Sequence, residues 1–202
     1  MTERAAYHHG SLRAALLSAA SDIIAEKGAG ALSVAEAAKR TGVSAGAPYR
    51  HFPGRLELLT AVVTEAAREF DAEVVAALPA GGGDDTWSGD AMAAAAAAYV
   101  RFVVRRRIGW DVLFGGELKD VQDPEKSAAT RALSDTFLGP AMAARPGDVR
   151  GALTLLERVL AASHGYASLY IAGMFEHAYP DVERAAAQAS AIARALVAQD
   201  QK

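Results

Sequence analysis

Residues 33–51 combine hydroxyl, guanidinium and imidazole side chains with small residues, in a spacing suited to binding a polyanion. Ser33 opens a short helical pattern, Thr41 to Val43 supply a turn with Gly42 at its centre, and a second short helical pattern runs to His51. In a helix-turn-helix of this kind, the second helix presents small and polar groups to a DNA groove, where hydroxyls and guanidiniums reach phosphates or guanine. The positions expected to be exposed on that helix are Ser44, Ala45, Gly46, Tyr49 and Arg50.

Residue patterns that carry catalysis or bind metal are missing from the sequence. The chain has no Cys, which excludes thiolate zinc sites, Cys nucleophiles and disulfides. It has no Ser-His-Asp constellation, no HExxH motif, and no Lys-Ser/Thr after the Gly-rich stretch 79–85. His8 and His9 are adjacent but have no third ligand in view, so they make a poor metal site. We therefore expect no catalytic residue, no metal and no cofactor.

Helices must position the polar groups of residues 33–51, because almost every segment has helical periodicity and no sustained alternation indicates a strand. Ser33 with Glu36 makes a capping box, and Ser11 and Gly28 are expected to cap and to end the first helix. The predicted fold class is all-α, with an N-terminal three-helix domain and a C-terminal helical domain. The expected helices are 11–27, 33–40, 45–51, 55–78, 90–107, 110–114, 124–144, 149–175 and 182–199.

Charge is unevenly distributed along the 202 residues. Residues 1–55 carry an excess of three positive charges, whereas the rest of the chain carries an excess of six negative charges. A basic N-terminal segment followed by an acidic remainder indicates that the N-terminal segment binds an anion. The chain has no apolar stretch long enough for a membrane span and no apolar run in residues 1–10 that could serve as a signal peptide, so a cytoplasmic protein is expected.

Residues 8–63 resemble the DNA-binding region of tetracycline-repressor (TetR) family regulators. The resemblance is carried by the pattern xVSxxxxYxHF over 42–52, by the basic residue Arg55, and by the Leu58-Leu59 pair that opens a long helix. The stretch 7–12 before the first helix is also similar to members of this family. The resemblance implies a dimeric, all-helical, ligand-responsive transcriptional regulator.

The same resemblance implies roles for individual residues in DNA binding. Ser33 matches a hydroxyl at a helix start that contacts phosphate, and Tyr49 matches a tyrosine that touches the phosphate backbone. His51 stands at a position that often contacts phosphate as well. Arg55 stands where Lys is common, at the start of the long helix. The full predicted DNA-binding set is Ser33, Ser44, Ala45, Gly46, Pro48, Tyr49, Arg50, His51 and Arg55. Phe52 is expected to pack in the core.

The stretch 99–115, together with His164-Gly165, resembles a subgroup whose C-terminal domain is named for a Trp-His-Gly motif, although Ser163 stands where the Trp would be. Aromatic residues are scarce but cluster here, and small-molecule sites are usually apolar cavities with a few polar groups. The predicted effector pocket consists of Tyr99, Phe102, Trp110, Phe114 and His164. Packing within the core is the alternative for each of them.

The helix expected at 149–175 is apolar nearly all round, which indicates burial on two sides. Together with the last helix it could form a two-fold four-helix interface, and the alternative is that both helices merely close the core of one protomer. The predicted interface residues are Tyr166, Tyr170, Ala189, Ile192 and Leu196.

The sequence therefore predicts a DNA-binding domain over residues 1–54 and a ligand-binding and dimerisation domain over 55–202, with helix 55–78 connecting them. The predicted function is that of a homodimeric regulator, in particular a repressor released from near-palindromic double-stranded DNA by a small-molecule effector, with no membrane partner. The alternatives are a helical interaction protein without DNA binding and, less favoured, an all-α enzyme.

Overall fold

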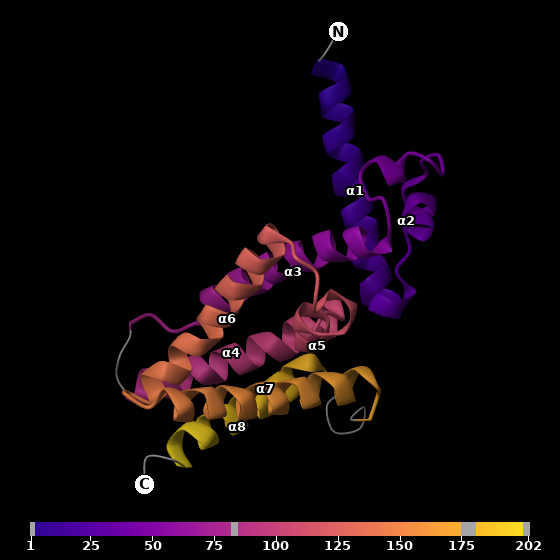
Figure 1. Cartoon of the computed structure of the whole chain (residues 1–202). Coiled ribbons are helices and arrows are strands. Elements are labelled where there is room, and N and C mark those ends of the chain that lie inside the picture. The colour runs from indigo at the N-terminus through magenta and orange to yellow at the C-terminus, as the bar shows by residue number, and fades with distance from the viewer. Residues whose placement is uncertain (1–2, 82–84, 175–180, 200–202) are drawn as a thin grey trace. The chain divides into compact units, whose positions relative to one another are not determined.

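The computed structural model describes residues 3–81, 85–174 and 181–199, without the side chains of 3–11 and 85–87. Within these ranges the chain forms eight α-helices and three short 3₁₀ turns and has no strand, so the all-α prediction is confirmed (Figure 1). No described helix is long and apolar enough to cross a membrane. The side chains of His8 and His9 and part of the Gly-rich stretch 79–85 lie outside what the structure describes.

The α-helices are α1 (Glu3–Lys27), α2 (Val34–Thr41), α3 (Arg55–Ala77), α4 (Asp85–Arg106), α5 (Trp110–Phe114), α6 (Pro124–Ala144), α7 (Val149–Ile171) and α8 (Val182–Gln199). The 3₁₀ turns are η1 (Ala29–Ala31), η2 (Pro48–Arg50) and η3 (Gly116–Leu118). The expected bounds of α2, α3, α5, α6 and α8 agree with the structure to within one residue.

Three helix ends differ from the sequence prediction. The first helix begins at Glu3, so Ser11 lies inside α1 and the prediction that it caps the helix is wrong. Modest propensity costs at one Gly and one Ser do not stop a long helix whose later turns are packed. The helix α4 begins at Asp85, five residues before the expected start. The helix α7 ends at Ile171, not at 175, and Gly173 takes a left-handed φ of 73°.

The chain divides into two compact units. Unit 1 contains residues 1–66 and 106–127, and unit 2 contains residues 67–105 and 128–202. The helices α3, α4 and α6 contribute residues to both units, α4 only through Arg106. The assignment of roles to residues 1–54 and 55–202 stays a prediction.

In unit 1, α1 packs against α2, η1 and η2 (Figure 1). The face of α1 that carries Leu16, Ile23 and Ile24 is fully buried, as are Ala37 of α2 and Leu58 of α3. Burying an aliphatic side chain contributes about 1.5–3 kcal/mol, so this small core fixes the position of the short segments between α1 and α3.

In unit 2, an aromatic cluster forms the centre of the core. The rings of Phe70 and Phe102 stack with their centroids 4.1 Å apart, and Phe137 meets Phe70 edge-on at 5.6 Å. The alanine run of α4 is almost entirely buried, and such small side chains let neighbouring helices approach closely. The helices α7 and α8 lie side by side and antiparallel (Figure 1). Asp148 caps α7, accepting a 2.9 Å hydrogen bond from the Gly151 N–H.

Candidate nucleic-acid interface

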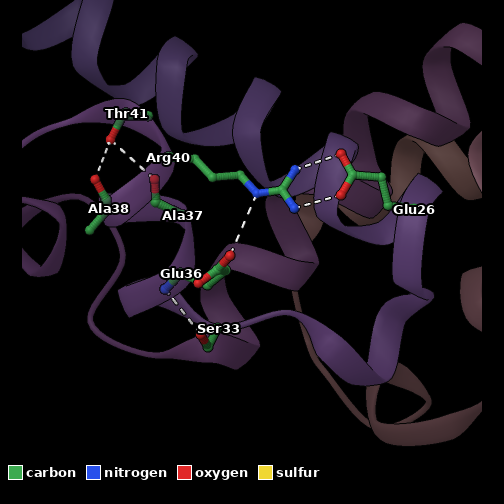
Figure 2. Close-up of polar contacts among 7 residues, drawn as sticks. All are labelled: Glu26, Ser33, Glu36, Ala37, Ala38, Arg40 and Thr41. Carbon is green, nitrogen blue, oxygen red and sulfur yellow. Dashed lines mark hydrogen bonds and ion pairs between the residues drawn. The ribbon is translucent and has the colours of Figure 1, made fainter.

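Both ends of α2 are fixed by local hydrogen bonds (Figure 2). The Ser33 hydroxyl accepts a 3.1 Å bond from the Glu36 N–H, which confirms that Ser33 caps the helix. At the other end, Gly42 has a left-handed φ of 69°, and its N–H reaches the carbonyls of Ala38 and Lys39. A residue with a Cβ atom is strained in this conformation, so glycine suits the turn.

The helix α2 is also tied to α1 by charge. The Arg40 guanidinium donates two hydrogen bonds, of 2.8 and 2.6 Å, to the Glu26 carboxylate, and its Nε lies 3.7 Å from Glu36 (Figure 2). The hydrogen bond from Arg40 lowers the pKa of Glu26, and the same bond raises the pKa of Arg40. A two-pronged Arg–carboxylate pair fixes the orientation of both groups better than a single contact does. The pair therefore helps to hold the turn after α2 in place.

The segment after the turn is not the α-helix expected at 45–51. It consists of consecutive turns and the single 3₁₀ turn η2, in which Ala47 N–H bonds to the Ser44 carbonyl and His51 N–H to the Pro48 carbonyl. The prediction of an α-helix here is wrong for two physical reasons. Pro48 has no N–H to donate, and its ring crowds the carbonyl four residues earlier. Gly46 adds a further conformational cost to a regular helix.

Most of the predicted DNA-binding residues of this segment lie at the surface. Tyr49 is 49% exposed, which is unusual for so large a ring. Ser44, Ala45, Gly46 and Arg50 are also exposed, whereas Ser33 and His51 are half-buried. Pro48 is buried, so its ring packs inside the unit, and its place near the bases stays a prediction. Phe52 is 3% exposed and packs in the core as expected.

The guanidinium of Arg55 bonds to groups within unit 1 and does not extend freely toward a phosphate. Its Nε donates a 2.8 Å bond to the Leu32 carbonyl, one Nη donates a 2.8 Å bond to the Ala29 carbonyl, and the other pairs with Glu117 of η3. Arg55 thus joins three segments of unit 1 that are far apart in sequence. The resemblance that singled out Arg55 carried no signal for these internal partners.

Two family models match the chain, and together they cover both units. The model described as bacterial regulatory proteins of the tetR family matches residues 16–62. The model described as a tetracyclin repressor-like C-terminal domain matches residues 92–194, which is half of the chain. The chain belongs to the TetR family. It is therefore a DNA-binding transcriptional regulator, and residues 33–55 lie inside the matched DNA-binding region.

Solved structures with the same TetR-like fold extend over nearly the whole chain. A protein of unknown function from Rhodococcus sp. RHA1 is 29% identical, with 96% of this chain and 98% of that one covered and a TM-score of 0.72. A tetR-family regulatory protein from Rhodococcus RHA1 is 23% identical, with 92% and 96% covered and a TM-score of 0.61. A tetR-family regulator from Streptomyces coelicolor is 22% identical, with 94% and 81% covered and a TM-score of 0.65. A search among curated proteins found no match.

The residues predicted to form an effector pocket in this TetR-family chain divide between the two units. Tyr99, Phe102 and His164 belong to unit 2, whereas Trp110 and Phe114 belong to unit 1, where their rings lie 4.4 Å apart. Tyr99 and Phe102 are fully buried in the aromatic cluster of unit 2. The Tyr99 hydroxyl lies 2.9 Å from Nδ1 of the half-buried His164, and the Tyr99 ring packs near the rings of Phe70 and Phe137. Membership of the Trp-His-Gly subgroup stays a prediction.

The residues predicted to form a dimer interface lie at the α7–α8 pair. Tyr166 and Tyr170 of α7 and Ile192 and Leu196 of α8 are half-buried, so part of each side chain remains at the surface. Ala189 is 1% exposed, so its methyl group already packs within the protomer, and its place at an interface stays a prediction. Ala185, Ala186 and Ala193 of α8 are buried too, so Ala189 belongs to the buried face of this helix.

Sequence reasoning missed two basic residues beside the turn. Lys39 is exposed in the last turn of α2, close to Gly42. Arg40 donates hydrogen bonds to the Glu26 carboxylate. The Lys39-Arg40 pair in the sequence is the signal that could have pointed to them. Only the fold reveals that Arg40 faces α1, because Glu26 lies 14 residues away.

Proposed function

We propose that this TetR-family regulator is a homodimeric repressor that a small-molecule effector releases from a near-palindromic operator. The observation that supports it best is the surface formed by Tyr49 and Arg50 directly after the Gly42 turn. A half-exposed tyrosine beside an exposed arginine, on a segment held by α1 and α2, has the chemistry of a phosphate-binding surface.

In the proposed complex, the hydroxyl of Tyr49 and the guanidinium of Arg50 bind phosphates. Ser33 accepts a bond from Glu36 but keeps its own proton to donate to a phosphate. The exposed residues Ser44, Ala45 and Gly46 are small enough to let the backbone approach base edges in the major groove. His51 adds a phosphate contact at the end of the turn.

Two-fold pairing of α7 and α8 is the proposed route to the dimer. A four-helix interface between two copies would cover the half-exposed side chains of Tyr166, Tyr170, Ile192 and Leu196. Two DNA-binding segments about 34–36 Å apart would then read successive major grooves.

The proposed effector binds near the Tyr99–His164 pair in unit 2 and favours a dimer geometry unsuited to DNA. Such coupling requires only that the effector binds the two geometries with different affinities. A chain of this family that acts on transcription needs no catalysis, so we propose no enzyme activity. Because the chromosome is its target, the cytoplasm is its proposed location.

The DNA contacts are tested with the operator recovered by in vitro selection and fluorescence anisotropy. We expect Tyr49→Phe and Arg50→Ala each to weaken binding about tenfold, since each removes one hydrogen bond to a charged phosphate. Arg50→Ala, which removes a positive charge, should also make the slope of log K against log salt less negative by about one. Arg131→Ala, which removes an exposed arginine of unit 2, is the matched control. Equal affinities for all four proteins would refute the assignment.

The dimer is tested separately by sedimentation. Leu196→Arg should yield a folded monomer, because a buried and unpaired guanidinium is costly at an apolar interface. Arg substitution of the exposed Val75 of α3 is the control and should leave the oligomeric state unchanged. A wild-type chain that sediments as a monomer at micromolar concentration would contradict the proposal.

A further inference from the structure

One buried hydroxyl on α7 has no hydrogen-bond partner. Ser163 is 1% exposed, and its Oγ bonds to no group in the described parts of the chain. A desolvated hydroxyl without a partner costs stability, and an alanine would fill almost the same space. Four other helical hydroxyls donate to the carbonyl four residues earlier, namely those of Thr41, Thr60, Thr64 and Ser134. A ligand that meets the Ser163 hydroxyl would explain why a serine stands here.

The residue beside Ser163 carries a second donor. Nδ1 of His164 lies 2.9 Å from the Tyr99 hydroxyl of α4. An imidazole nitrogen is a better acceptor than a phenol oxygen, so Tyr99 donates to Nδ1 and the proton of the neutral ring is on Nε2. Nε2 makes no hydrogen bond to a described residue, and the ring is half-buried. Tyr99 is therefore a positioning residue that leaves the Nε2–H of His164 for a ligand.

The two donors share a face of α7 that is otherwise apolar. Leu160 and Ala167 each lie three or four positions from both Ser163 and His164, so the four side chains are neighbours on the helix. Ala167 is fully buried and Leu160 is half-buried. The rings that pack beside the Tyr99 ring are those of Phe70 and Phe137. A few donors within aliphatic and aromatic surface are the usual lining of a small-molecule site.

The charge of the surrounding core favours a neutral ligand. Arg145 is the only buried Lys or Arg side chain that the structure describes in unit 2. Its guanidinium already donates to the carbonyls of Ala144, Leu196 and Val197. A carboxylate buried beside Ser163 would lack a cationic side chain to pair with, and burial of an unpaired charge is costly. A carbonyl oxygen, in contrast, accepts two hydrogen bonds without carrying a charge.

We infer that the effector site of unit 2 binds neutral carbonyl compounds, namely ketones and esters with an apolar body. The carbonyl oxygen accepts one hydrogen bond from the Ser163 hydroxyl and one from the Nε2–H of His164. The inference rests on the proposed effector site near the Tyr99–His164 pair, and it names the class of molecule that binds there. The Ser163 hydroxyl then costs stability only in the free chain, because the ligand satisfies it in the complex.

The test uses acetophenone as the probe, with α-methylstyrene, in which CH₂ replaces the carbonyl oxygen, as its isostere. Binding to the full-length chain is measured by calorimetry and by the amide chemical shifts of Ser163, His164 and Ala167. Ser163→Ala should weaken acetophenone binding about tenfold and leave α-methylstyrene binding unchanged. The four dissociation constants form a cycle, so the greater hydrophobicity of α-methylstyrene cancels. Equal effects on both probes, or no saturable binding of acetophenone, would overturn the inference.

Benzoate, which has the same ring but a negative charge, tests the preference for a neutral ligand. It should bind more weakly than acetophenone, and tighter binding of benzoate would overturn the assigned class. Ser190→Ala is the matched control, because its hydroxyl belongs to the same unit and already donates to the Ala93 carbonyl. This variant should change the affinities for acetophenone and α-methylstyrene by the same factor.

Nitrogen-15 NMR of the imidazole tests the role given to His164. The free chain should carry the ring proton on Nε2, and Tyr99→Phe should populate the other tautomer and weaken acetophenone binding. A ring proton on Nδ1 in the wild type would overturn this role, because Nε2 would then be an acceptor.

Failure of this inference can be told apart from failure of the proposed effector role, because the binding constants are measured without DNA. If acetophenone binding depends on Ser163 as expected but leaves operator affinity unchanged, the carbonyl site stands and the effector role is refuted. If acetophenone releases the operator equally from the wild type and from Ser163→Ala, the effector role stands and the carbonyl site is refuted.

Discussion

The Glu26 carboxylate and the Arg40 guanidinium face each other across α1 and α2, joined by hydrogen bonds of 2.8 and 2.6 Å. The bond from Arg40 keeps the pKa of Glu26 below its ordinary value of 4.5. A carboxylate with a depressed folded-state pKa contributes stability that is present in full above its unfolded pKa. That contribution is lost as the pH falls through the lower folded-state pKa.

We therefore expect Glu26→Gln to lower the urea midpoint at neutral pH and to approach the wild type as the pH falls through the lowered folded-state pKa of Glu26. The effect should be small and should shrink at high salt, because the pair is exposed to solvent. Asp135→Asn, which removes another exposed carboxylate, should show no comparable loss at neutral pH. A Glu26→Gln deficit that persists unchanged in acid would contradict the role of this pair.

Substitution of Arg55 should affect folding before it affects DNA binding. Its guanidinium bonds to the carbonyls of Leu32 and Ala29 and pairs with Glu117, so Arg55→Ala removes all three interactions. We expect a decrease of about 1–3 kcal/mol in the free energy of unfolding, measured by urea denaturation. Arg55→Lys should recover little of it, because an ammonium cannot span the same acceptors.

Glu117→Gln is the control for Arg55 because it removes the ion pair and leaves both carbonyl bonds of Arg55 in place. It should cost less than about 1 kcal/mol. If Arg55→Ala kept the wild-type stability and lost only operator affinity, Arg55 would instead be the phosphate-binding residue that the family resemblance implies.

A methyl group added at Gly42 should destabilise the chain through backbone strain alone. The residue has a φ of 69°, and a Cβ atom placed there would meet no atom within 4 Å. We expect Gly42→Ala to cost about 1–2 kcal/mol, which thermal or urea unfolding can measure. Gly30→Ala is the matched control, because its Cβ also meets no atom within 4 Å and its φ is not in the positive region. Equal stability of the two variants would show that the turn does not require glycine.

The sequence predicted most helix bounds because caps and breakers are local signals. Ser33 and Gly42 each act on residues within four positions, and each does in the structure what its type and place predicted. An α-helix was wrongly predicted at 45–51 because the small residues there are compatible with a helix. Pro48 limits the helical part of this segment to a 3₁₀ turn.

Partners distant in sequence left no such signal. Arg40 of α2 pairs with Glu26 of α1, and Arg55 of α3 pairs with Glu117 of η3, only after these elements have packed together. The site was therefore predictable as a stretch of residues, but the roles of its arginines were not. Burial of Pro48 and Ala189 was likewise decided by packing rather than by residue type.

We expect substitution of two serines of unit 2 to have opposite effects on the free energy of unfolding. The Ser163 hydroxyl is buried on α7 and has no hydrogen-bond partner among the described residues. The Ser190 hydroxyl of α8 donates a 2.7 Å bond to the Ala93 carbonyl of α4. A buried hydroxyl without a partner costs about 1–3 kcal/mol, whereas a satisfied one contributes about 0.5–1.5 kcal/mol.

Ser163→Ala should therefore leave the free energy of unfolding unchanged or raise it by about 1 kcal/mol, because it removes a desolvated group at almost constant volume. Ser190→Ala should lower the same quantity by about 1 kcal/mol, because the Ala93 carbonyl is deprived of its donor. The two substitutions remove the same atom, so helix propensity cancels between them and the difference measures hydrogen bonding. If Ser163→Ala were the more damaging of the two, its hydroxyl would have a partner in solution, such as a bound water or an effector.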